Sequence, residues 1–234
     1  MPTTRRQPPL INAPLPVTVF ATLMVGLHLV RILLPESWQV GVFFEGALIP
    51  GRFWAPEGSP GPSGLPGYEG RLAAFVPLIA SGLLHSDWMH VILNAAFLVA
   101  LAKPLLELFR RVWPGQEPGA SGLLLGLFLF SQIISGLVYL GLNHPGGGAA
   151  VGASGGISGL LAAVLLIREG PGRWLLARGF LVASALFVVA NGLIALLGPG
   201  LLGASIAWEA HLGGYVGGAL AMRLVLLRFE AGAA

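Results

Sequence analysis

The chain alternates between long apolar stretches and short polar connections, and this pattern limits the folds that are open to it. A membrane-spanning helix needs about 20 consecutive, mainly apolar residues. Six stretches have this character, at residues 15–34, 88–109, 120–142, 149–167, 174–197 and 201–227. Charged residues make up only 10% of the sequence, whereas a soluble domain carries about 25%. The sequence therefore predicts an all-α polytopic membrane protein with a bundle of six transmembrane helices.

The basic residues predict the orientation of these helices. With a cytoplasmic N-terminus, Arg31, Arg52 and Arg71 are the outer basic residues. The others fall on the cytoplasmic side: Arg5, Arg6, Lys103, Arg110, Arg111, Arg168, Arg173, Arg178, Arg223 and Arg228. This excess follows the positive-inside rule, and it explains the pI of about 10.0 without a nucleic-acid partner. We therefore expect a multi-pass protein of a bacterial plasma membrane with both termini in the cytoplasm.

The connection between the first two apolar stretches is far longer than an ordinary helix–helix loop. Its apolar segment at 72–84 contains Pro77 and is too short to span, which favours an interfacial or re-entrant position. The expected parts of the chain are a cytoplasmic tail at 1–14, a membrane domain at 15–228 with a long outer loop at 35–87, and a cytoplasmic tail at 229–234.

Polar residues inside the apolar stretches are candidates for function, because an unpaired polar group in a membrane is costly. Ser154 lies about five residues into the fourth stretch and His211 about ten into the sixth. His90 and Asn94 lie four apart near the start of the second, so they share a helix face. These three helices all run inward from the outer side, which places the four residues at a similar depth. A serine and a histidine at one level can form a hydrolytic nucleophile and its base.

Glycines allow the two helices that carry Ser154 and His211 to approach closely. Gly155 and Gly159 lie four apart, and the same spacing relates the doubled glycines 213–214 and 217–218. Such small-residue patterns bring helix backbones into contact in membranes. The glycines can serve packing alone, but close packing is also what a bond between the two side chains requires.

Each candidate also has a structural interpretation. A lone serine in a helix usually bonds to a backbone carbonyl, and a lone histidine is often structural. Glu209 lies about 200° around a helix from His211, so it should point away. Residues 152–156 match Gly-x-Ser-x-Gly, but that motif follows a strand in soluble hydrolases, and we expect a helix here.

Metal and thiol chemistry are not expected. The chain has no cysteine, and it lacks the His-Glu-x-x-His motif of zinc proteases. His85 and His90 diverge by about 140° on a helix and make a poor metal pair. No metal or other cofactor is therefore predicted.

Three motifs together resemble the rhomboid family of intramembrane serine proteases. They are Gly152-x-Ser154-Gly155, Ala210-His211-x-x-Gly214 and His85-x-x-x-x-His90-x-x-x-Asn94. The motifs occur in the order and in the spans that the family shows. The resemblance implies a six-helix bundle with a long first outer loop. It also implies a serine endopeptidase that cleaves transmembrane segments of other membrane proteins near the outer face.

The resemblance assigns a role to each matching residue. Ser154 resembles the nucleophile and His211 the general base of a dyad without an acid. His90, Asn94 and the Ser154 N–H resemble the oxyanion hole. The remaining matches are supporting residues: His85, Gly152, Gly155 and Gly214.

The chain departs from the family at two places. Ser158 stands where an aromatic residue often packs against the histidine, so another group must hold the ring. The family's first-loop Trp-Arg is replaced by Val76-Pro77, so the geometry of this loop does not follow from the resemblance. The alternative functions are a non-catalytic rhomboid-like protein that binds membrane clients and a small transporter, whose polar residues should lie nearer the midplane.

Overall fold

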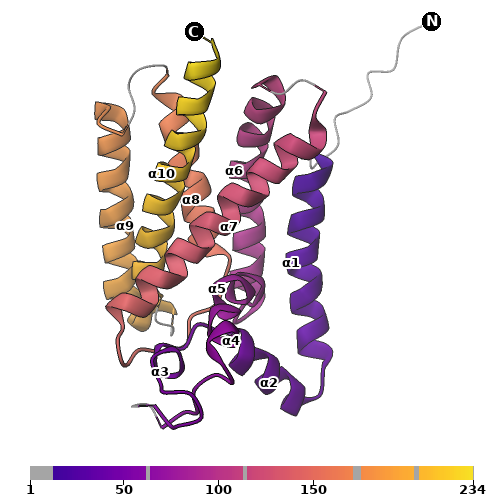
Figure 1. Ribbon diagram of the computed structural model, residues 1–234, viewed down its shortest axis with the longest axis vertical. Helices are drawn as coiled ribbons and strands as arrows, with labels where there is room; N and C mark the ends of the chain where they lie inside the picture. The colour runs from indigo at the N-terminus through magenta and orange to yellow at the C-terminus, as the bar shows by residue number, and fades with distance from the viewer. Residues whose placement is uncertain (1–12, 62–63, 113–114, 171–174, 203–205, 234) are drawn as a thin grey trace, which may run out of the picture.

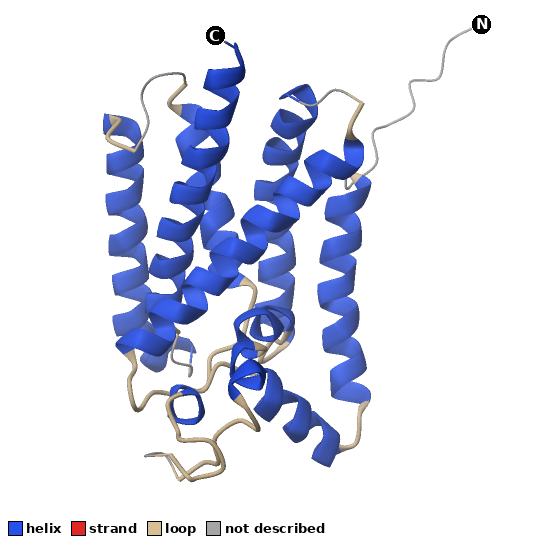
Figure 2. Ribbon diagram, viewed as in Figure 1, coloured by secondary structure: helices blue, strands red, loops and turns tan. Residues whose placement is uncertain are grey.

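The computed structural model describes residues 13–61, 64–112, 115–170, 175–202 and 206–233, which form a bundle of helices (Figure 1). The longer helices are α1 (Leu15–Leu33), α6 (Trp88–Val112), α7 (Glu117–Leu142), α8 (Ser154–Arg168), α9 (Arg178–Leu202) and α10 (Trp208–Ala233). The described part of the chain contains helices and loops but no strand (Figure 2). The predicted all-α fold class is therefore confirmed.

Within the described residues, five helices are long and apolar enough to cross a membrane: Leu15–Leu33, Trp88–Arg111, Glu117–Leu142, Arg178–Gly200 and Trp208–Glu230. Helix α8 has 15 residues. At 1.5 Å per residue it extends for about 22 Å, less than the ~30 Å hydrocarbon core. A sixth full span at 149–167 is therefore not confirmed, since the first five residues of that stretch lead into α8 without being helical.

Three helices, α8, α9 and α10, begin later than the apolar pattern predicted, at Ser154, Arg178 and Trp208 instead of residues 149, 174 and 201. Helix α8 begins at Ser154 instead of residue 149, because Gly152 has φ +121°, which a helix does not accommodate. Helix α9 continues through Pro199 to Leu202, so the predicted start of the last span at residue 201 was wrong. At the chain ends, α10 runs into the expected tail at 229–234, and most of the expected tail at 1–14 lies outside the described residues.

Helix α10 packs against α8 through glycines, as the small-residue patterns predicted, and glycines of α10 also contact α7. On one face, a Cβ atom added to Gly218 would overlap the backbone of Gly159 in α8. On the adjacent face, a Cβ added to Gly213 would lie 2.7 Å from the Cβ of Val138 in α7. Helices α8 and α10 therefore touch with almost no side-chain layer between their backbones, which is the arrangement that glycine permits in membranes, whereas α7 meets α10 through side chains such as Val138.

The first loop folds into short helices at one end of the bundle. These are α2 (Glu36–Gly46), α3 (Pro50–Phe53), α4 (Arg71–Phe75) and α5 (Pro77–Ala80). They lie at the end opposite to the start of α1 and the end of α10 (Figure 1). The apolar segment at 72–84 falls in α4, α5 and a following turn, so the prediction that it does not span is confirmed.

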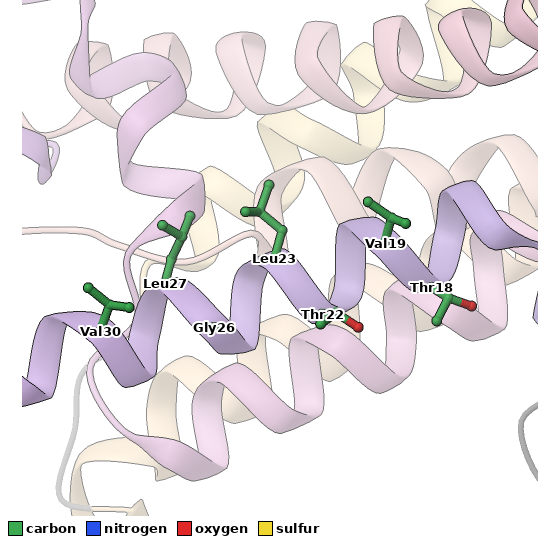
Figure 3. A pocket seen from close by; sticks show the side chains of 7 residues that line it. All are labelled: Thr18, Val19, Thr22, Leu23, Gly26, Leu27 and Val30. Carbon is green, nitrogen blue, oxygen red and sulfur yellow. The ribbon is translucent and has the colours of Figure 1, made fainter.

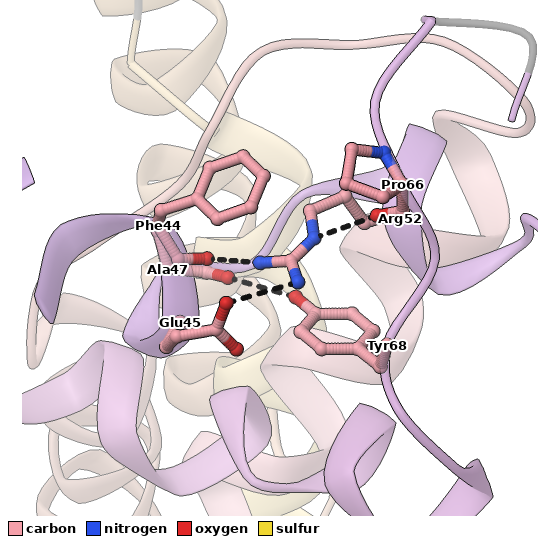
Figure 4. A network of polar contacts seen from close by, with 6 residues as sticks. All are labelled: Phe44, Glu45, Ala47, Arg52, Pro66 and Tyr68. Carbon is pink, nitrogen blue, oxygen red and sulfur yellow. Dashed lines mark hydrogen bonds and ion pairs between the residues drawn. The ribbon is translucent and has the colours of Figure 1, made fainter. Parts of the chain in front are cut away.

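A buried arginine organises this loop (Figure 4). The guanidinium of Arg52 lies 3.8 Å from the ring centroid of Phe44 and 4.1 Å from that of Tyr68. It donates to the Pro66 carbonyl at 3.0 Å and pairs with the Glu45 carboxylate at 3.1 Å. Cation–π contacts and hydrogen bonds together satisfy a charge that would be costly to bury alone. The loop is thus tied together around one side chain.

Exposed apolar side chains cover the outside of the bundle. Helix α1 carries a shallow apolar hollow that its own residues line (Figure 3): Thr18, Val19, Thr22, Leu23, Gly26, Leu27 and Val30. On α9, Leu186 and Leu196 are 66% and 77% exposed. Such faces suit a lipid bilayer and not water. Together with the five apolar helices, they identify an integral, multi-pass membrane protein.

Candidate active site

Ser154 is the first residue of α8 and follows a sharp turn of the chain. Before the turn, Ala150 and Leu48 exchange two backbone hydrogen bonds of 2.8 and 3.0 Å. Gly152 then adopts φ +121°, which only glycine reaches without strain. The prediction that Ser154 lies five residues inside a helix was therefore wrong. Its backbone N–H is one of those that a helix start leaves without an intrahelical partner.

The backbone around the Gly-x-Ser-x-Gly match at 152–156 resembles the strand–turn–helix of soluble hydrolases more closely than we expected. The chain first forms an isolated β-bridge at Ala150, then turns at Gly152, whose φ is positive, and then starts a helix at Ser154. This sequence of elements exposes the serine at a bend, as a strand–turn–helix does in soluble hydrolases. The expectation of a continuous helix at this motif was wrong.

The hydroxyl of Ser154 lies next to the imidazole of His211. The distance from Ser154 Oγ to His211 Nε2 is 2.9 Å, a hydrogen bond between α8 and α10. His211 is in the first turn of α10 and not ten residues into it, because that helix begins at Trp208. Gly214, one turn further along, lies against the backbone of Gly155. The close glycine contact is therefore what brings the two side chains within bonding distance.

His90 and Asn94 lie beside the turn that precedes Ser154. A Cβ atom added to Gly152 would be 2.6 Å from His90 Nε2 and 3.6 Å from Asn94 Nδ2. Asn94 is buried, and its Nδ2 has no hydrogen-bond partner within the described part of the chain. A buried donor without a partner is costly and is typical of a catalytic or ligand-binding role. Both side chains thus point nitrogen atoms at the space next to Gly152.

A short polar chain at the start of α6 sets the tautomer of His90. Ser86 Oγ donates to the Asp87 carboxylate at 2.7 Å, and this bond lowers the pKa of Asp87. Ser86 Oγ therefore accepts from Nδ1–H of His90, 3.0 Å away. In a neutral ring the Nε2 facing Gly152 then carries no hydrogen. His90 can donate from Nε2 only when its ring is protonated.

A buried glutamine holds both sides of the turn at Ser154. Gln132 Oε1 accepts from Gly156 N–H at 2.9 Å, and Nε2 donates to the Gly152 carbonyl at 3.4 Å. Gly152 N–H in turn donates to the Ser81 carbonyl of the first loop at 2.8 Å. Sequence reasoning missed Gln132, although a lone amide in the apolar stretch at 120–142 was a visible signal.

A second amide, also missed, contacts the imidazole from the far side. Asn191 Oδ1 of α9 lies 2.7 Å from His211 Nδ1. Its signal in the sequence was the same as that of Gln132, a single amide within an apolar stretch. Glu209, in contrast, lies 3.5 Å from Asn143 Nδ2, in keeping with the prediction that it points away from His211.

His85 packs behind His90 and stays out of the contact between Ser154 and His211. Its ring centroid is 5.0 Å from that of His90, and the side chain is fully buried. Burial, with smaller contributions from His90 and His28, lowers the pKa of His85 to about 3. His85 is therefore neutral at physiological pH and supports the His90 ring by packing.

The arrangement as a whole has the groups and the geometry that acyl transfer requires. A hydroxyl is hydrogen-bonded to an imidazole that can accept its proton, which is the geometry of an activated nucleophile. The unpartnered Asn94 amide and the free N–H at the start of α8 lie close by and can stabilise an oxyanion.

Comparison with known protein families gives an assignment. A model of the Rhomboid domain matches residues 73–228, about two thirds of the chain. The matched segment contains Ser154, His211, His90 and Asn94, and it also contains Gln132 and Asn191. No curated protein matches the chain in a sequence search. With a family match of this extent, the chain belongs to the rhomboid family.

Proposed function

We propose that this protein is an intramembrane serine endopeptidase that cleaves transmembrane segments of other membrane proteins through a dyad of Ser154 and His211. The observation that carries the proposal is the 2.9 Å hydrogen bond between Ser154 Oγ and His211 Nε2. Family membership alone does not decide this, because some relatives bind membrane clients without cleaving them. The presence and contact of both groups favour the protease.

In the proposed acylation, His211 Nε2 removes the proton of Ser154 as Oγ attacks the scissile carbonyl carbon. The C–O bond forms, and the carbonyl oxygen becomes an oxyanion. His211 then gives its proton to the leaving amine, the C–N bond breaks, and an acyl-enzyme remains. In the second half a water molecule loses its proton to His211 and attacks the ester carbonyl carbon. The bond from that carbon to Ser154 Oγ then breaks, His211 returns the proton to Oγ, and the new carboxyl end is released.

The oxyanion has three candidate donors. Asn94 Nδ2 and the Ser154 N–H can donate at any pH at which the protein is folded. His90 can donate from Nε2 only as the protonated ring, which the ionised Asp87 supports through Ser86. Donors of this kind act on charge that exists only in the transition state.

We expect Asn94→Ala to lower kcat by roughly 10²–10³-fold, the effect of losing one oxyanion donor in a soluble protease, with little change in KM.

His90→Ala should lower kcat most at acidic pH and less as the pH rises, because the neutral His90 ring already lacks a hydrogen on Nε2. Initial rates across pH in detergent or liposomes measure both effects. An increase in KM alone for either variant would place that residue in substrate binding instead.

We place the dyad in the outer half of the membrane. The excess of basic residues predicts cytoplasmic termini, and the start of α1 and the end of α10 lie at the same end of the bundle (Figure 1). The first loop, which binds the segment before Ser154 through Leu48, lies at the opposite end. A substrate helix has to unwind there, because a regular helix keeps its amides in internal hydrogen bonds.

Cleavage of a single-span substrate in intact cells tests the reaction and the orientation together. The substrate has known topology, a tag at each end and helix-breaking residues near its outer end. We expect release of the outer fragment into the medium, with a new end mapped by mass spectrometry to the outer part of the span. Stable association of the substrate without any cleavage would favour client binding, and a cut at the cytoplasmic end would invert the orientation.

A further inference from the structure

Helix α9 meets the catalytic helix α10 along one stripe of side chains. Ser184 Oγ lies 2.8 Å from the Tyr215 hydroxyl. Phe180 and Phe187 stack on the Tyr215 ring, with centroid distances of 6.1 and 4.4 Å. Asn191 continues the stripe one turn after Phe187, and Tyr215 lies one turn after His211, so the same pair of faces brings the amide to the imidazole.

The orientation of the Asn191 amide follows from its second hydrogen bond. Nδ2 donates to the Phe187 carbonyl at 2.9 Å, and a carbonyl can only accept. The other amide atom, Oδ1, therefore faces His211 Nδ1 at 2.7 Å. Because Oδ1 is an acceptor, Nδ1 of the ring carries the hydrogen.

This hydrogen decides what the other ring nitrogen can do. A neutral imidazole carries one N–H, so a hydrogen on Nδ1 leaves Nε2 with a free lone pair. Nε2 is the atom that lies 2.9 Å from Ser154 Oγ. The opposite tautomer would present an N–H to the hydroxyl and could not take its proton.

We propose that Asn191 is a positioning residue that fixes the tautomer and the rotation of His211, in the place that a carboxylate takes in a triad. The inference rests on the proposed function of the dyad. It also explains how the ring is held although Ser158, and not an aromatic side chain, lies one turn after Ser154. Asn191 is 5% exposed, so water does not compete freely for the bond.

The same contact supports the ring during the reaction. When His211 takes the proton of Ser154, both of its nitrogens carry hydrogen, and the bond from Nδ1 to Asn191 Oδ1 becomes charge-assisted. Without the amide, the ring can rotate or change tautomer between turnovers. The loss then appears in kcat, since substrate binding does not involve Nδ1.

Kinetics of three variants test the role. Asn191→Ala should lower kcat by roughly 10- to 100-fold, by analogy with the loss of the hydrogen-bond partner of a metal-bound histidine, with KM nearly unchanged. Asn191→Asp keeps an acceptor and should retain most of the activity, with the acidic limb of its pH–rate profile moved to higher pH, because a carboxylate stabilises the protonated ring. Ser184→Ala is the matched control, since it removes the neighbouring bond between α9 and α10 without touching His211.

The kinetic outcomes separate a positioning role from a structural one. Equal losses in Asn191→Ala and Ser184→Ala, with no recovery and no shifted pH profile in Asn191→Asp, would overturn the proposal. That pattern would show that the stripe only holds the two helices together.

The ¹⁵N chemical shifts of His211 test the inference without any cleavage. The chain has five histidines, so His211→Gln identifies the signal. We expect the Nδ1–H tautomer in the wild type and its loss in Asn191→Ala but not in Ser184→Ala. A wild-type Nε2–H tautomer, or no change in Asn191→Ala, would overturn the role of Asn191 even in an active protease. If His211 shows the expected ¹⁵N shifts but the protein shows no serine-dependent cleavage, the proposed function is refuted. The inference that Asn191 sets the tautomer of His211 then still stands.

Discussion

Ser154→Ala is expected to abolish proteolysis while leaving a folded, membrane-inserted protein. The substitution removes the one hydroxyl that lies 2.9 Å from His211 Nε2. In soluble serine proteases, loss of the nucleophile lowers kcat by about 10⁶-fold, so cleavage of a single-span substrate in liposomes should fall below detection. The fold should persist, because the deleted atom bonds to no group other than the imidazole within the described part of the chain.

Ser158→Ala is the matched control for this variant. Ser158 lies one turn further along α8 and is 7% exposed, so the change deletes an equally small hydroxyl from the same helix. It should cleave at close to the wild-type rate, and both variants should keep the melting temperature of the wild type within a few degrees. Undiminished cleavage by Ser154→Ala would remove this serine from the mechanism.

Gly214→Ala is expected to cause the largest loss that does not remove a reacting atom. Its new Cβ would overlap the carbonyl oxygen of Gly155 and lie 2.7 Å from that carbonyl carbon. Both atoms are backbone, so they cannot move aside as a side chain could, and α8 and α10 must separate. Overpacking of this kind costs about 1–3 kcal/mol of stability. Because His211 lies three residues before Gly214, the separation also lengthens the bond to Ser154.

We therefore expect Gly214→Ala to lower both the melting temperature and the cleavage rate, the latter by more than about 100-fold given the steep distance dependence of such contacts. Gly126→Ala on α7 is the control, because a Cβ there meets nothing within 4 Å. Thermal unfolding in detergent and cleavage in liposomes measure the two effects. Wild-type activity in Gly214→Ala would show that the close contact of α8 and α10 is not what aligns the dyad.

Features that depend on apolar length or on residue spacing could be predicted from the sequence. The all-α fold and the non-spanning segment at 72–84 follow from the length of apolar stretches. The contact between α8 and α10 follows from glycines four residues apart, since such spacing places them on one face. These signals are local, and a single sequence carries them fully.

Helix starts were less predictable, because apolar composition does not distinguish a helix from an extended segment that precedes it. Residues 149–153 are as apolar as the helix that follows, yet the left-handed Gly152 delays its start to Ser154. The connection expected between residues 197 and 201 was also wrong, since α9 continues through Pro199 to Leu202. The error shifted the expected position of Ser154 and His211 in their helices without separating them.

The contacts of Asn191 and Gln132 could not be predicted, because they depend on which faces the packed helices turn toward one another. Asn191 and Gln132 stand out as lone amides in apolar stretches, but neither bonds to a side chain of its own helix in the described part of the chain. Their bonds to His211 and to Gly156 cross between helices. Only the packed structure shows which side chains these amides reach.

Covalent labelling with a fluorophosphonate tests the central claim most directly, because the reagent reacts preferentially with a serine that a nearby base has activated. We expect the purified protein to form a single phosphonyl adduct, which mass spectrometry of the digested protein assigns to Ser154. The adduct should be absent from Ser154→Ala and strongly reduced in His211→Gln, and it should form normally in Ser158→Ala. An unlabelled wild type that is folded, or labelling that persists in His211→Gln at the wild-type rate, would contradict the assignment of Ser154 and His211 as a catalytic dyad.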